Sequence, residues 1–498
     1  MDFCSTRNSA LRVSSARAIL QGLAEDGGLF VPAQLPRFTE PEIMMRAAMN
    51  YQKTAETVLS AFLPDYTREE LRSFVAAAYG KQFDTPQIAP LQPVRPGTYA
   101  LELWHGPTCA FKDFALQLLP HLLKAAAEKC GEPRDIAILT ATSGDTGKAA
   151  MEGFADVPGT HICVFYPAGG VSRMQQLQMT TQQGENVNVL AVEGNFDDAQ
   201  SGVKQLFTDA SLRQELADKG FLLSSANSIN WGRLAPQVVY YFWAYAQLLK
   251  TGGVEMGQKV NFVVPTGNFG DILAGYLAKK AGLPVGKLIC ASNANNVLTE
   301  FLNTGVYNKN RPFHLTQSPS MDILISSNLE RLLYLLCEDD KAVAGWMEEL
   351  QRDGRYFIGE ALLQKLHQEG FEAFWCDDAH AASSIRELWF ERGYLCDPHT
   401  GVAANALRQY AALTGDKTPA VIVSTASPFK FASAMLPAMD LDFSGDEFQQ
   451  LEAMEIVSSR TAPAPLKRLK DQPVRFDRVI SRQEMRAAVV QWLEGGKA

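Results

Sequence analysis

The stretch NFVVPTGNFGDILAGYLAKKAG, residues 261–282, determines the fold class of this chain. It begins with a short apolar strand, continues through a glycine-containing turn at 265–271, and enters an apolar helix at Asp271. A continuous apolar strand is typical of a sheet whose two faces are both covered. A strand that leads directly into a helix is the repeating unit of parallel α/β architecture. The stretch therefore predicts a parallel sheet with helices packed on both sides.

The same alternation of strand and helix recurs on both sides of this stretch. Strands are predicted at 136–140, 162–166, 187–192, 260–265, 288–291 and 420–424, and helices at 148–154, 173–182, 201–219, 236–249 and 271–281. The strands fall into two groups separated by a long helical stretch. We therefore predict an α/β protein with two parallel-sheet α/β domains and a cleft between them. After Asp440 we expect mixed helix and loop, with a last helix from Ser481.

Residues before about 90 follow a different pattern. Apolar residues at helical spacing predict helices at 51–63 and 68–79, and Thr67 with Glu70 resembles a capping box for the second helix. Four prolines within 85–97 mark a boundary. The predicted division is an additional mainly helical N-terminal domain at 1–93, a small α/β domain at 136–235, and a large α/β domain made of 94–135 and 236–498.

Composition excludes several functional classes. The chain has 498 residues, of which 46% are hydrophobic and 20% charged, and its formal net charge is −9. Such an apolar fraction is inconsistent with a largely disordered chain, and an acidic protein is a poor general binder of nucleic acid or of anionic membranes. The longest apolar run, 238–246, is far shorter than the roughly 18 residues of a membrane span. We therefore expect a soluble protein.

Cysteines and histidines indicate neither a disulfide framework nor a metal centre. The eight cysteines show no C-x-x-C spacing, and the seven histidines form no H-x-x-x-H or H-E-x-x-H pattern. Reduced thiols in a cytoplasmic compartment are the favoured interpretation. The N-terminus lacks the apolar segment of a secretory signal. Its arginine and serine content leaves a transit peptide as an alternative, against which Asp2 argues.

Two turns that follow predicted strands are candidates for binding anions. In the turn at 265–271, Gly267 and Gly270 permit unusual backbone dihedrals, and the following helix N-terminus directs N–H groups at one point, which suits a phosphate. The alternative is an ordinary turn with a helix cap. The turn ATSGDTGKAA, 141–150, could hold a carboxylate through Ser143 and Thr146, or its hydroxyls could bond to their own backbone. Neither turn has the Walker A pattern, so a nucleotide site is disfavoured.

The segment HGPTCAFKDFALQLLP, residues 105–120, places a lysine on an apolar helix face. Lys112, Ala115, Leu116 and Leu119 follow i, i+3, i+4, i+7 spacing, so the amine belongs to the first turn of that face. Burial and the positive end of the helix dipole both disfavour the charged form. A neutral lysine is a nucleophile that can form a Schiff base. The alternative is a solvated amine whose stem alone lies on the apolar face.

Further polar segments leave two interpretations open. In SANSINWGR, 225–233, the candidates for a second anion are Asn227, Ser228, Asn230 and Arg233. The alternative is a polar loop that caps the next helix. SPSMDILISSN, 318–328, is either another site or a helix entry, and His399 is expected in a capping turn instead of a site.

Taken together, these segments resemble threonine synthases. The resemblance rests on HGPTCAFKDFALQLL, TSGDTGKAA, SSANSINWGR, PTGNFGDILAGYLAKK, SPSMDILISSNLERLL and DPHTG, with STRN at 5–8 and GLAEDGGLFVP at 22–32. The segments occur in the same order from residue 5 to about 430. The resemblance implies the fold of type II enzymes of pyridoxal 5′-phosphate (PLP), the family that resembles the tryptophan synthase β subunit. The large domain would then be the one that binds PLP.

The resemblance also implies roles for individual residues. Lys112 would hold PLP as an imine, and Thr425 would face the pyridine nitrogen of the cofactor. A neutral hydroxyl at that nitrogen leaves the ring a weaker electron sink than a carboxylate would. The cofactor phosphate would lie on Gly267, Asn268, Phe269, Gly270 and Asp271. The substrate carboxylate would lie on Ser143, Gly144, Asp145 and Thr146, and the candidates for the substrate phosphate are Asn227, Ser228, Asn230 and Arg233.

The reaction implied is the conversion of O-phospho-L-homoserine and water into L-threonine and phosphate, the last step of threonine biosynthesis. It is a γ-elimination followed by β-addition of water, catalysed by a carbon–oxygen lyase acting on phosphates. Lys112 would remove the Cα proton and then move protons between Cα, Cβ and the cofactor. The expected partner is this small molecule, for a monomer or homodimer that binds no nucleic acid and no membrane.

Two departures from the family pattern concern substrate contacts. NANNVLTEF at 293–301 has Asn296 where an aspartate is more usual, and GVAANAL follows DPHT where a run of small residues is expected. Two alternative functions remain. A phospholyase would release an oxoacid and ammonia, so product analysis separates it from a threonine synthase. A non-catalytic metabolite-binding protein is disfavoured because Lys112 stands in a complete segment.

Overall fold

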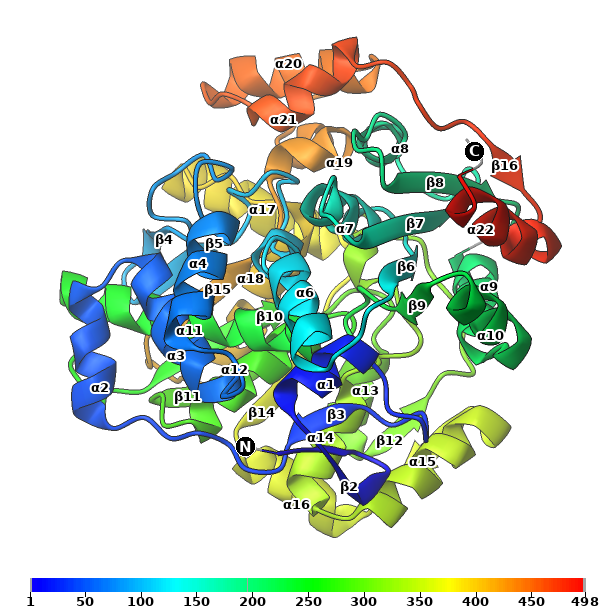
Figure 1. Ribbon diagram of the computed structural model, residues 1–498. Helices are drawn as coiled ribbons and strands as arrows, with labels where there is room; N and C mark the ends of the chain where they lie inside the picture. The colour runs from blue at the N-terminus through cyan, green and yellow to red at the C-terminus, as the bar shows by residue number, and fades with distance from the viewer. Residues whose placement is uncertain (1, 195, 496–498) are drawn as a thin grey trace.

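The computed structural model describes residues 2–194 and 196–495, and two parallel sheets dominate its architecture (Figure 1). The larger sheet has six strands in the order β14–β11–β10–β15–β5–β4, parallel except for β4, which is antiparallel to β5. Its strands are β4 Leu91–Arg95, β5 Thr98–Glu102, β10 Val260–Pro265, β11 Val285–Ser292, β14 Phe371–Trp375 and β15 Ala420–Ser424.

The smaller sheet has five parallel strands in the order β16–β8–β7–β6–β9. These are β6 Asp135–Ala141, β7 Thr160–Pro167, β8 Val187–Val192, β9 Phe221–Ser224 and β16 Val479–Ile480. Every strand predicted from the apolar runs lies in one of the two sheets. The prediction of two parallel-sheet α/β domains is confirmed.

Alternate residues of β10 enter different cores, which explains why this strand is apolar throughout. Phe262 and Val264 belong to the core that contains α11 and α12, whereas Val263 belongs to the core that contains α18. Successive side chains of a strand point to opposite faces, so helices on both faces require apolar residues at every position. The carboxyl end of this doubly covered strand runs straight into the glycine turn.

Helices surround both sheets. Those that follow β5 in the chain are α5 Lys112–Leu116, α6 Leu119–Lys129, α7 Asp145–Phe154, α8 Arg173–Thr180, α9 Phe196–Thr208, α10 Ala210–Asp218, α11 Trp231–Thr251 and α12 Gly270–Lys280. They are followed by α13 Val297–Thr304, α14 Leu329–Cys337, α15 Asp340–Asp353, α16 Glu360–Gln368, α17 Asp378–Arg392, α18 Pro398–Thr414, α19 Ala432–Ala438, α20 Glu447–Ser458, α21 Ala464–Lys467 and α22 Met485–Leu493. A short antiparallel pair is formed by β12 Val306–Asn308 and β13 Arg355–Phe357.

The N-terminal region is mainly helical, as predicted, but it also holds a small sheet. Its helices are α1 Ser15–Gln21, α2 Glu40–Met45, α3 Tyr51–Phe62 and α4 Arg68–Ala78. The capping box before α4 is present, with Glu70 N–H donating to Thr67 Oγ1 at 3.2 Å and Thr67 N–H donating to the Glu70 carboxylate at 2.7 Å. The small antiparallel sheet consists of β1 Phe3–Ser5, β2 Asn8–Val13 and β3 Phe30–Pro32. Two of its strands are three residues long, too short for a periodic signal.

Two predicted helices differ from the observed ones. The single helix predicted over 201–219 is two helices, α9 and α10, because Asp209 accepts hydrogen bonds from the N–H groups of Ser211 (2.9 Å) and Leu212 (3.0 Å) and starts a new helix. The helix predicted to start at Pro236 begins at Trp231, because Asn230 caps it, and Pro236 lies inside it. A strong cap thus fixes the start of the helix ahead of the proline.

The C-terminal segment returns to the smaller sheet. Strand β16 pairs in parallel with β8, and α22 packs in the same core as α9 and α10. Figure 1 shows this red segment beside β8, away from the larger sheet. The predicted assignment of all residues after 235 to the large domain is therefore wrong for this segment. A two-residue edge strand leaves no periodicity that sequence analysis could detect.

Candidate active site

Lys112 opens α5 with its amine in the interior of the protein. The residue is 9% exposed, and its Nζ lies 3.4 Å from Ser320 Oγ and 3.6 Å from Asp145 Oδ2. Burial lowers the pKa of this amine below its usual value, Asp145 opposes that effect, and the charges of Lys430 and Arg233 add to it. The amine of Lys112 therefore lies on an apolar helix face, as the residue spacing predicts.

The turn that precedes Lys112 is tied to the end of β15. The Phe111 N–H donates to the carbonyl of Thr425 at 2.8 Å. Asp113 closes the turn from the other side, accepting hydrogen bonds from the N–H (2.9 Å) and hydroxyl (2.6 Å) of Thr108. The Thr425 hydroxyl itself has no hydrogen-bond partner in the described part of the chain. Lys112 and this free hydroxyl are therefore held at neighbouring points of the same site.

The glycine turn after β10 presents a row of free backbone N–H groups. Phe269 adopts a φ of +62° as the N-cap of α12. The N–H groups of residues 267–271 donate no hydrogen bond to any other described residue, whereas the carbonyls of the turn are engaged. Ser326 Oγ donates to the carbonyl of Gly267 at 2.8 Å, and Asn328 Nδ2 donates to the next carbonyl at 3.0 Å. Unpaired N–H groups at the N-terminus of a helix form a site for an anion such as phosphate.

Asp271 lies in this turn, but its side chain points to the interior. Its Oδ1 accepts hydrogen bonds from the hydroxyls of Tyr240 (2.7 Å) and Tyr241 (2.8 Å), and its buried Oδ2 has no partner among the described residues. Burial raises the pKa of this carboxyl to about 6. A carboxylate repels a phosphate, so Asp271 can contribute its backbone N–H and not its side chain.

The second predicted turn also ends at a helix N-terminus with free donors. Gly144, with a φ of +132°, precedes α7, and Thr142 Oγ1 accepts hydrogen bonds from the N–H groups of Gly144 and Gly147, both at 2.9 Å. Within the described chain, the hydroxyls of Ser143 and Thr146 have no partner. This arrangement leaves donors for a carboxylate, as predicted for the turn.

Asp145 differs from its neighbours, because its carboxylate is already occupied. Lys430 Nζ lies 2.7 Å from Oδ1, and Ser320 Oγ donates to Oδ2 at 3.1 Å. Burial alone would raise the pKa of this carboxyl, but Lys430 and Lys112 outweigh burial and lower the pKa well below its usual range. An ionised carboxylate does not bind a second carboxylate. The predicted substrate role of this side chain does not fit the geometry, and only its N–H remains available.

Three residues of the site escaped the sequence analysis or were placed elsewhere by it. Lys430 was missed, since a lone lysine in STASPFKF has no distinguishing spacing. Ser320, in the open segment 318–328, contacts both Lys112 and Asp145. The N–H of Ser320 donates to His399 Nε2 at 3.2 Å, so His399 lines the site besides standing in the first turn of α18. The predicted place of His399 in a capping turn is confirmed, and its Nε2 contact with Ser320 is an additional feature that the sequence did not indicate.

Arg233 and Asn227 carry buried polar atoms without partners among the described residues, a donor in Arg233 and an acceptor in Asn227. Arg233 is buried, its Nη1 donates to the carbonyl of Ala226 at 2.5 Å, and its Nε has no partner in the described residues. No described carboxylate lies within ion-pair distance of it. Burial lowers the pKa of this guanidinium to about 10. Asn227 Oδ1 is likewise buried without a partner. A buried cation without a counter-charge favours an incoming anion.

The other two candidates in this segment have different surroundings. Asn230 accepts a hydrogen bond from Gly232 N–H at 2.8 Å and donates to the carbonyls of Ile19 (3.0 Å) and Ser225 (3.1 Å). Its side chain is used for capping and for holding α1, so it is not available to a substrate. Ser228 Oγ lies 3.3 Å from the hydroxyl of Ser327 and is half-buried.

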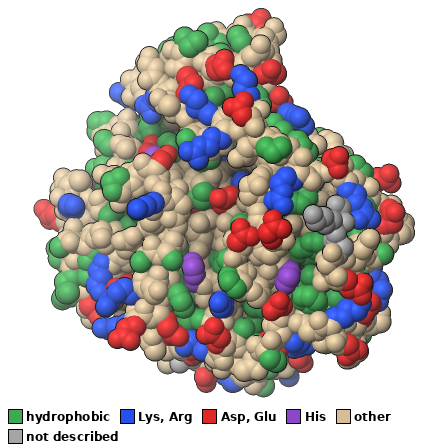
Figure 2. Space-filling view, turned by 45° about the horizontal axis from the view of Figure 1, so that its top comes forward, with side chains coloured by type: hydrophobic (Ala, Val, Ile, Leu, Met, Phe, Trp, Pro, Cys, Tyr) green, Lys and Arg blue, Asp and Glu red, His purple; other side chains and the backbone are tan. Residues whose placement is uncertain are grey.

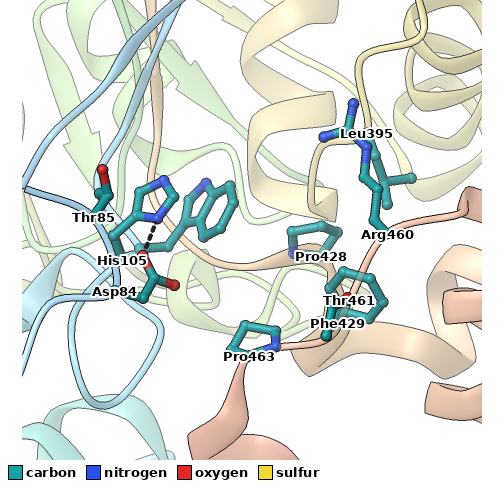
Figure 3. A pocket seen from close by; sticks show the side chains of 10 residues that line it. Asp84, Thr85, His105, Leu395, Pro428, Phe429, Arg460, Thr461 and Pro463 are labelled. Atoms are coloured by element: carbon teal, nitrogen blue, oxygen red, sulfur yellow. Dashed lines mark hydrogen bonds and ion pairs between the residues drawn. The ribbon is translucent and has the colours of Figure 1, made fainter. Parts of the chain in front are cut away.

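A cavity of about 310 Å³ lies between the segment before Lys112 and the segment around Pro428 (Figure 3). Its lining residues include none of the predicted site residues. On its wall, His105 lies between Asp84 (2.6 Å) and Glu102 (3.1 Å). Burial lowers the pKa of His105, but the two carboxylates outweigh it and raise the pKa to about 9. Phe429, on the opposite wall, adjoins Lys430 in the chain.

On the face shown in Figure 2, acidic and basic side chains are interspersed. None of the described helices is both long and apolar enough to span a bilayer. Within the same residues, no three His, Cys, Asp or Glu side chains are grouped so that they could hold a metal ion. The eight cysteines are all unpaired.

Comparisons with known proteins agree with this geometry. Residues 2–79 match the family model described as the threonine synthase N terminus, and residues 86–426 match that of pyridoxal-phosphate dependent enzymes. Threonine synthase of Pseudomonas aeruginosa is 40% identical over 437 residues, which cover 87% of this chain and 90% of that protein. The chain belongs to the threonine synthase family of PLP-dependent enzymes.

Two further family members show how far the similarity extends. The structure of PLP-bound threonine synthase from Brucella melitensis has a TM-score of 0.87 at 37% identity, with 100% of both chains covered. PLP fold type II is thereby confirmed for this chain. Threonine synthase-like 1 of Homo sapiens is 40% identical over 439 residues, which are 86% of this chain but 58% of that longer protein. The chain therefore spans less than two thirds of the length of that relative.

The residues of the site fit PLP. The free N–H groups of 267–271 suit its phosphate, the buried amine of Lys112 suits its aldehyde, and the free hydroxyl of Thr425 suits its ring nitrogen. Ser320 connects two of these parts, because its Oγ contacts the amine and its carbonyl lies 2.6 Å from the point where a Cβ at Gly267 would stand. The predicted cofactor residues, which are widely separated in the sequence, are thus brought together in one site.

Proposed function

We propose that this chain is a threonine synthase, which converts O-phospho-L-homoserine and water into L-threonine and phosphate with PLP as its cofactor. The observation that carries the proposal is the buried Lys112 amine, 3.6 Å from the Asp145 carboxylate, in a site with two sets of unpaired backbone N–H groups. One set, at the N-terminus of α12, suits the cofactor phosphate, and the other, at the N-terminus of α7, suits a carboxylate. The membership of the threonine synthase family supports the same activity.

When bound, PLP supplies the electron sink that allows a proton to leave the carbon next to the substrate amine. Lys112 attaches the cofactor and, when released by the substrate amine, removes that proton. Its lowered pKa, caused by burial, keeps a larger fraction of the amine uncharged and able to accept a proton near neutral pH. Thr425 supplies a neutral hydroxyl at the ring nitrogen, which limits the charge that the ring can hold there.

The substrate binds through its two anionic ends. Ser143 and Thr146 hold its carboxylate with their hydroxyls and with the adjoining backbone N–H groups. Arg233 holds its phosphate, together with the amide of Asn227, because the guanidinium is buried without a counter-charge and is close enough to Lys112 to affect its pKa. Asn230 is left out of this set because its side chain is used for capping.

The activity test uses the purified full-length chain with PLP. It measures visible absorbance, phosphate release from O-phospho-L-homoserine, and the organic products. Threonine and phosphate in equal amounts support the proposal, whereas an oxoacid with ammonia would identify a phospholyase. Lys112→Ala should abolish turnover. The matched control is Lys279→Ala, since Lys279 is also partly buried but donates to the carbonyls of Gly286 (3.0 Å) and Glu369 (2.6 Å) at the far end of α12.

We further infer that the main binding partner of this chain is its small-molecule substrate. We infer that the chain is a monomer or a homodimer and that it works in a cytoplasmic compartment. The eight unpaired cysteines support a reducing environment. Sedimentation of the purified chain gives its oligomeric state, and fractionation of the cells that produce it gives its location.

A further inference from the structure

Lys430 is a second buried lysine in the site, and its side chain is 0% exposed. Its Nζ lies 2.7 Å from Asp145 Oδ1 and donates to the carbonyl of Thr108 at 3.1 Å. A buried ammonium is costly unless it is paired and hydrogen-bonded, and these two contacts fulfil both conditions. No step assigned so far to the reaction uses this residue.

The carboxylate of Asp145 is shared between two cations. Lys430 lies 2.7 Å from one oxygen, and Lys112 lies 3.6 Å from the other, which also accepts the hydroxyl of Ser320 at 3.1 Å. One carboxylate neutralises one cation, and the shorter contact belongs to Lys430. The amine of Lys112 is therefore placed beside a carboxylate whose charge is already compensated.

We propose that Lys430 is a positioning residue that keeps Asp145 as a docking point for the Lys112 amine while preventing Asp145 from holding that amine as an ammonium ion. The proposal rests on the role of Lys112 proposed above. Ser320 and Asp145 orient the Lys112 amine whenever the cofactor does not hold it. Lys430 compensates the negative charge of Asp145, which would otherwise keep a proton on the Lys112 amine.

Among the described residues, no other charged group around Lys112 can replace Lys430. Arg233 of α11 is a buried cation without contact to Asp145, so it cannot neutralise that carboxylate. Asp271 of α12 is bonded to two tyrosines. His399 of α18 accepts the Ser320 N–H through Nε2 (3.2 Å) and contacts Asp397 through Nδ1 (2.5 Å), so its ring is bonded to these two groups and makes no contact with Asp145. Removal of Lys430 would therefore leave Lys112 as the nearest cation to Asp145.

The test measures the pH at which half of the Lys112 amine is uncharged. The full-length chain, purified without PLP, is labelled with trace acetic anhydride from pH 6 to 11, and the Lys112 peptide is quantified by mass spectrometry. In Lys430→Met, and in Lys430→Gln, which retains a hydrogen-bond donor, the midpoint should rise by about one pH unit or more, the effect expected of an unshared carboxylate within a few ångströms. Lys430→Arg retains the positive charge and should have the same midpoint as the unchanged protein.

The control is Lys148→Met, which removes another lysine paired with a carboxylate, Glu152 at 2.8 Å, from the same helix as Asp145. It should leave the Lys112 midpoint unchanged. Circular dichroism verifies the fold of each variant, and Lys430→Gln serves if Lys430→Met does not fold. An unaltered midpoint in a folded Lys430 variant, or a midpoint that falls, overturns the proposal. The measurement needs no turnover, so its result does not depend on the proposed activity. The activity test can fail while the Lys112 midpoint shifts as expected, and the midpoint can stay unchanged while the activity is found.

Discussion

Replacement of Gly267 by alanine tests whether the glycine turn and the Lys112 site are one unit. A Cβ at this position would stand 2.6 Å from the carbonyl oxygen of Ser320, closer than real Cβ contacts allow. The obstacle is backbone and not a flexible side chain, so either the turn or the Ser320 segment must move. Overpacking of this kind costs about 1–3 kcal/mol. Because Ser320 also contacts Lys112 and Asp145, the displacement reaches the amine.

Two measurements follow the Gly267→Ala change, namely urea unfolding and PLP affinity from visible absorbance. We expect a loss of stability of about 1–3 kcal/mol and a PLP affinity lowered about tenfold, since each 1.4 kcal/mol corresponds to a factor of ten. Gly345→Ala is the control, because Gly345 lies in α15 and no atom of the described residues lies within 4 Å of the position that a Cβ would take. Alanine there should stabilise the helix by up to about 1 kcal/mol. Unchanged stability and PLP affinity in Gly267→Ala would show that the turn and the Lys112 site are not coupled through Ser320.

Three further changes test other parts of the account. Arg233→Met should raise the KM for O-phospho-L-homoserine about tenfold or more, since a charged hydrogen bond contributes about 1.5–3 kcal/mol. An unchanged KM in steady-state kinetics would exclude the proposed phosphate contact. Asn230→Ala should lower stability by about 1 kcal/mol or more through the lost cap without raising that KM, and a selective KM effect would reinstate Asn230 as a substrate ligand. Burial lowers the pKa of His105, but Asp84 and Glu102 outweigh burial and raise it from 6.5 to about 9. The charged imidazole therefore contributes its full share of the folding stability below pH 6.5, and His105→Gln should be less stable than the unchanged chain there. That difference should close as pH rises through about 9 in urea unfolding, and a difference that grows with pH would contradict the assigned charge state.

The elements that sequence analysis located are those with local physical signals. Buried strands such as β10 are apolar at every position, because helices cover both faces of the sheet. The lysine at position 112 stands out because it interrupts an apolar helical face. The turn at 267–271 stands out because glycines precede a helix start. Each of these signals lies within a dozen residues of sequence.

The parts that escaped depend on contacts between distant segments. Lys430 acquires its role from Asp145, and nothing near it in the chain marks a buried ion pair. Asn230 could be interpreted either as a ligand or as a cap, and its bond to the distant carbonyl of Ile19 helps to show that its amide is already used. Strand β16 is two residues long and owes its place to β8. Such features require knowledge of which segments the fold brings together.

Two buried lysines flank Asp145, so the decisive measurement is which of them carries the cofactor. The full-length chain loaded with PLP is reduced with borohydride, digested, and mapped by mass spectrometry. We expect the pyridoxyl phosphate label on Lys112 and no label on Lys430. A label on Lys430, or the absence of any label at either lysine, would contradict this expectation.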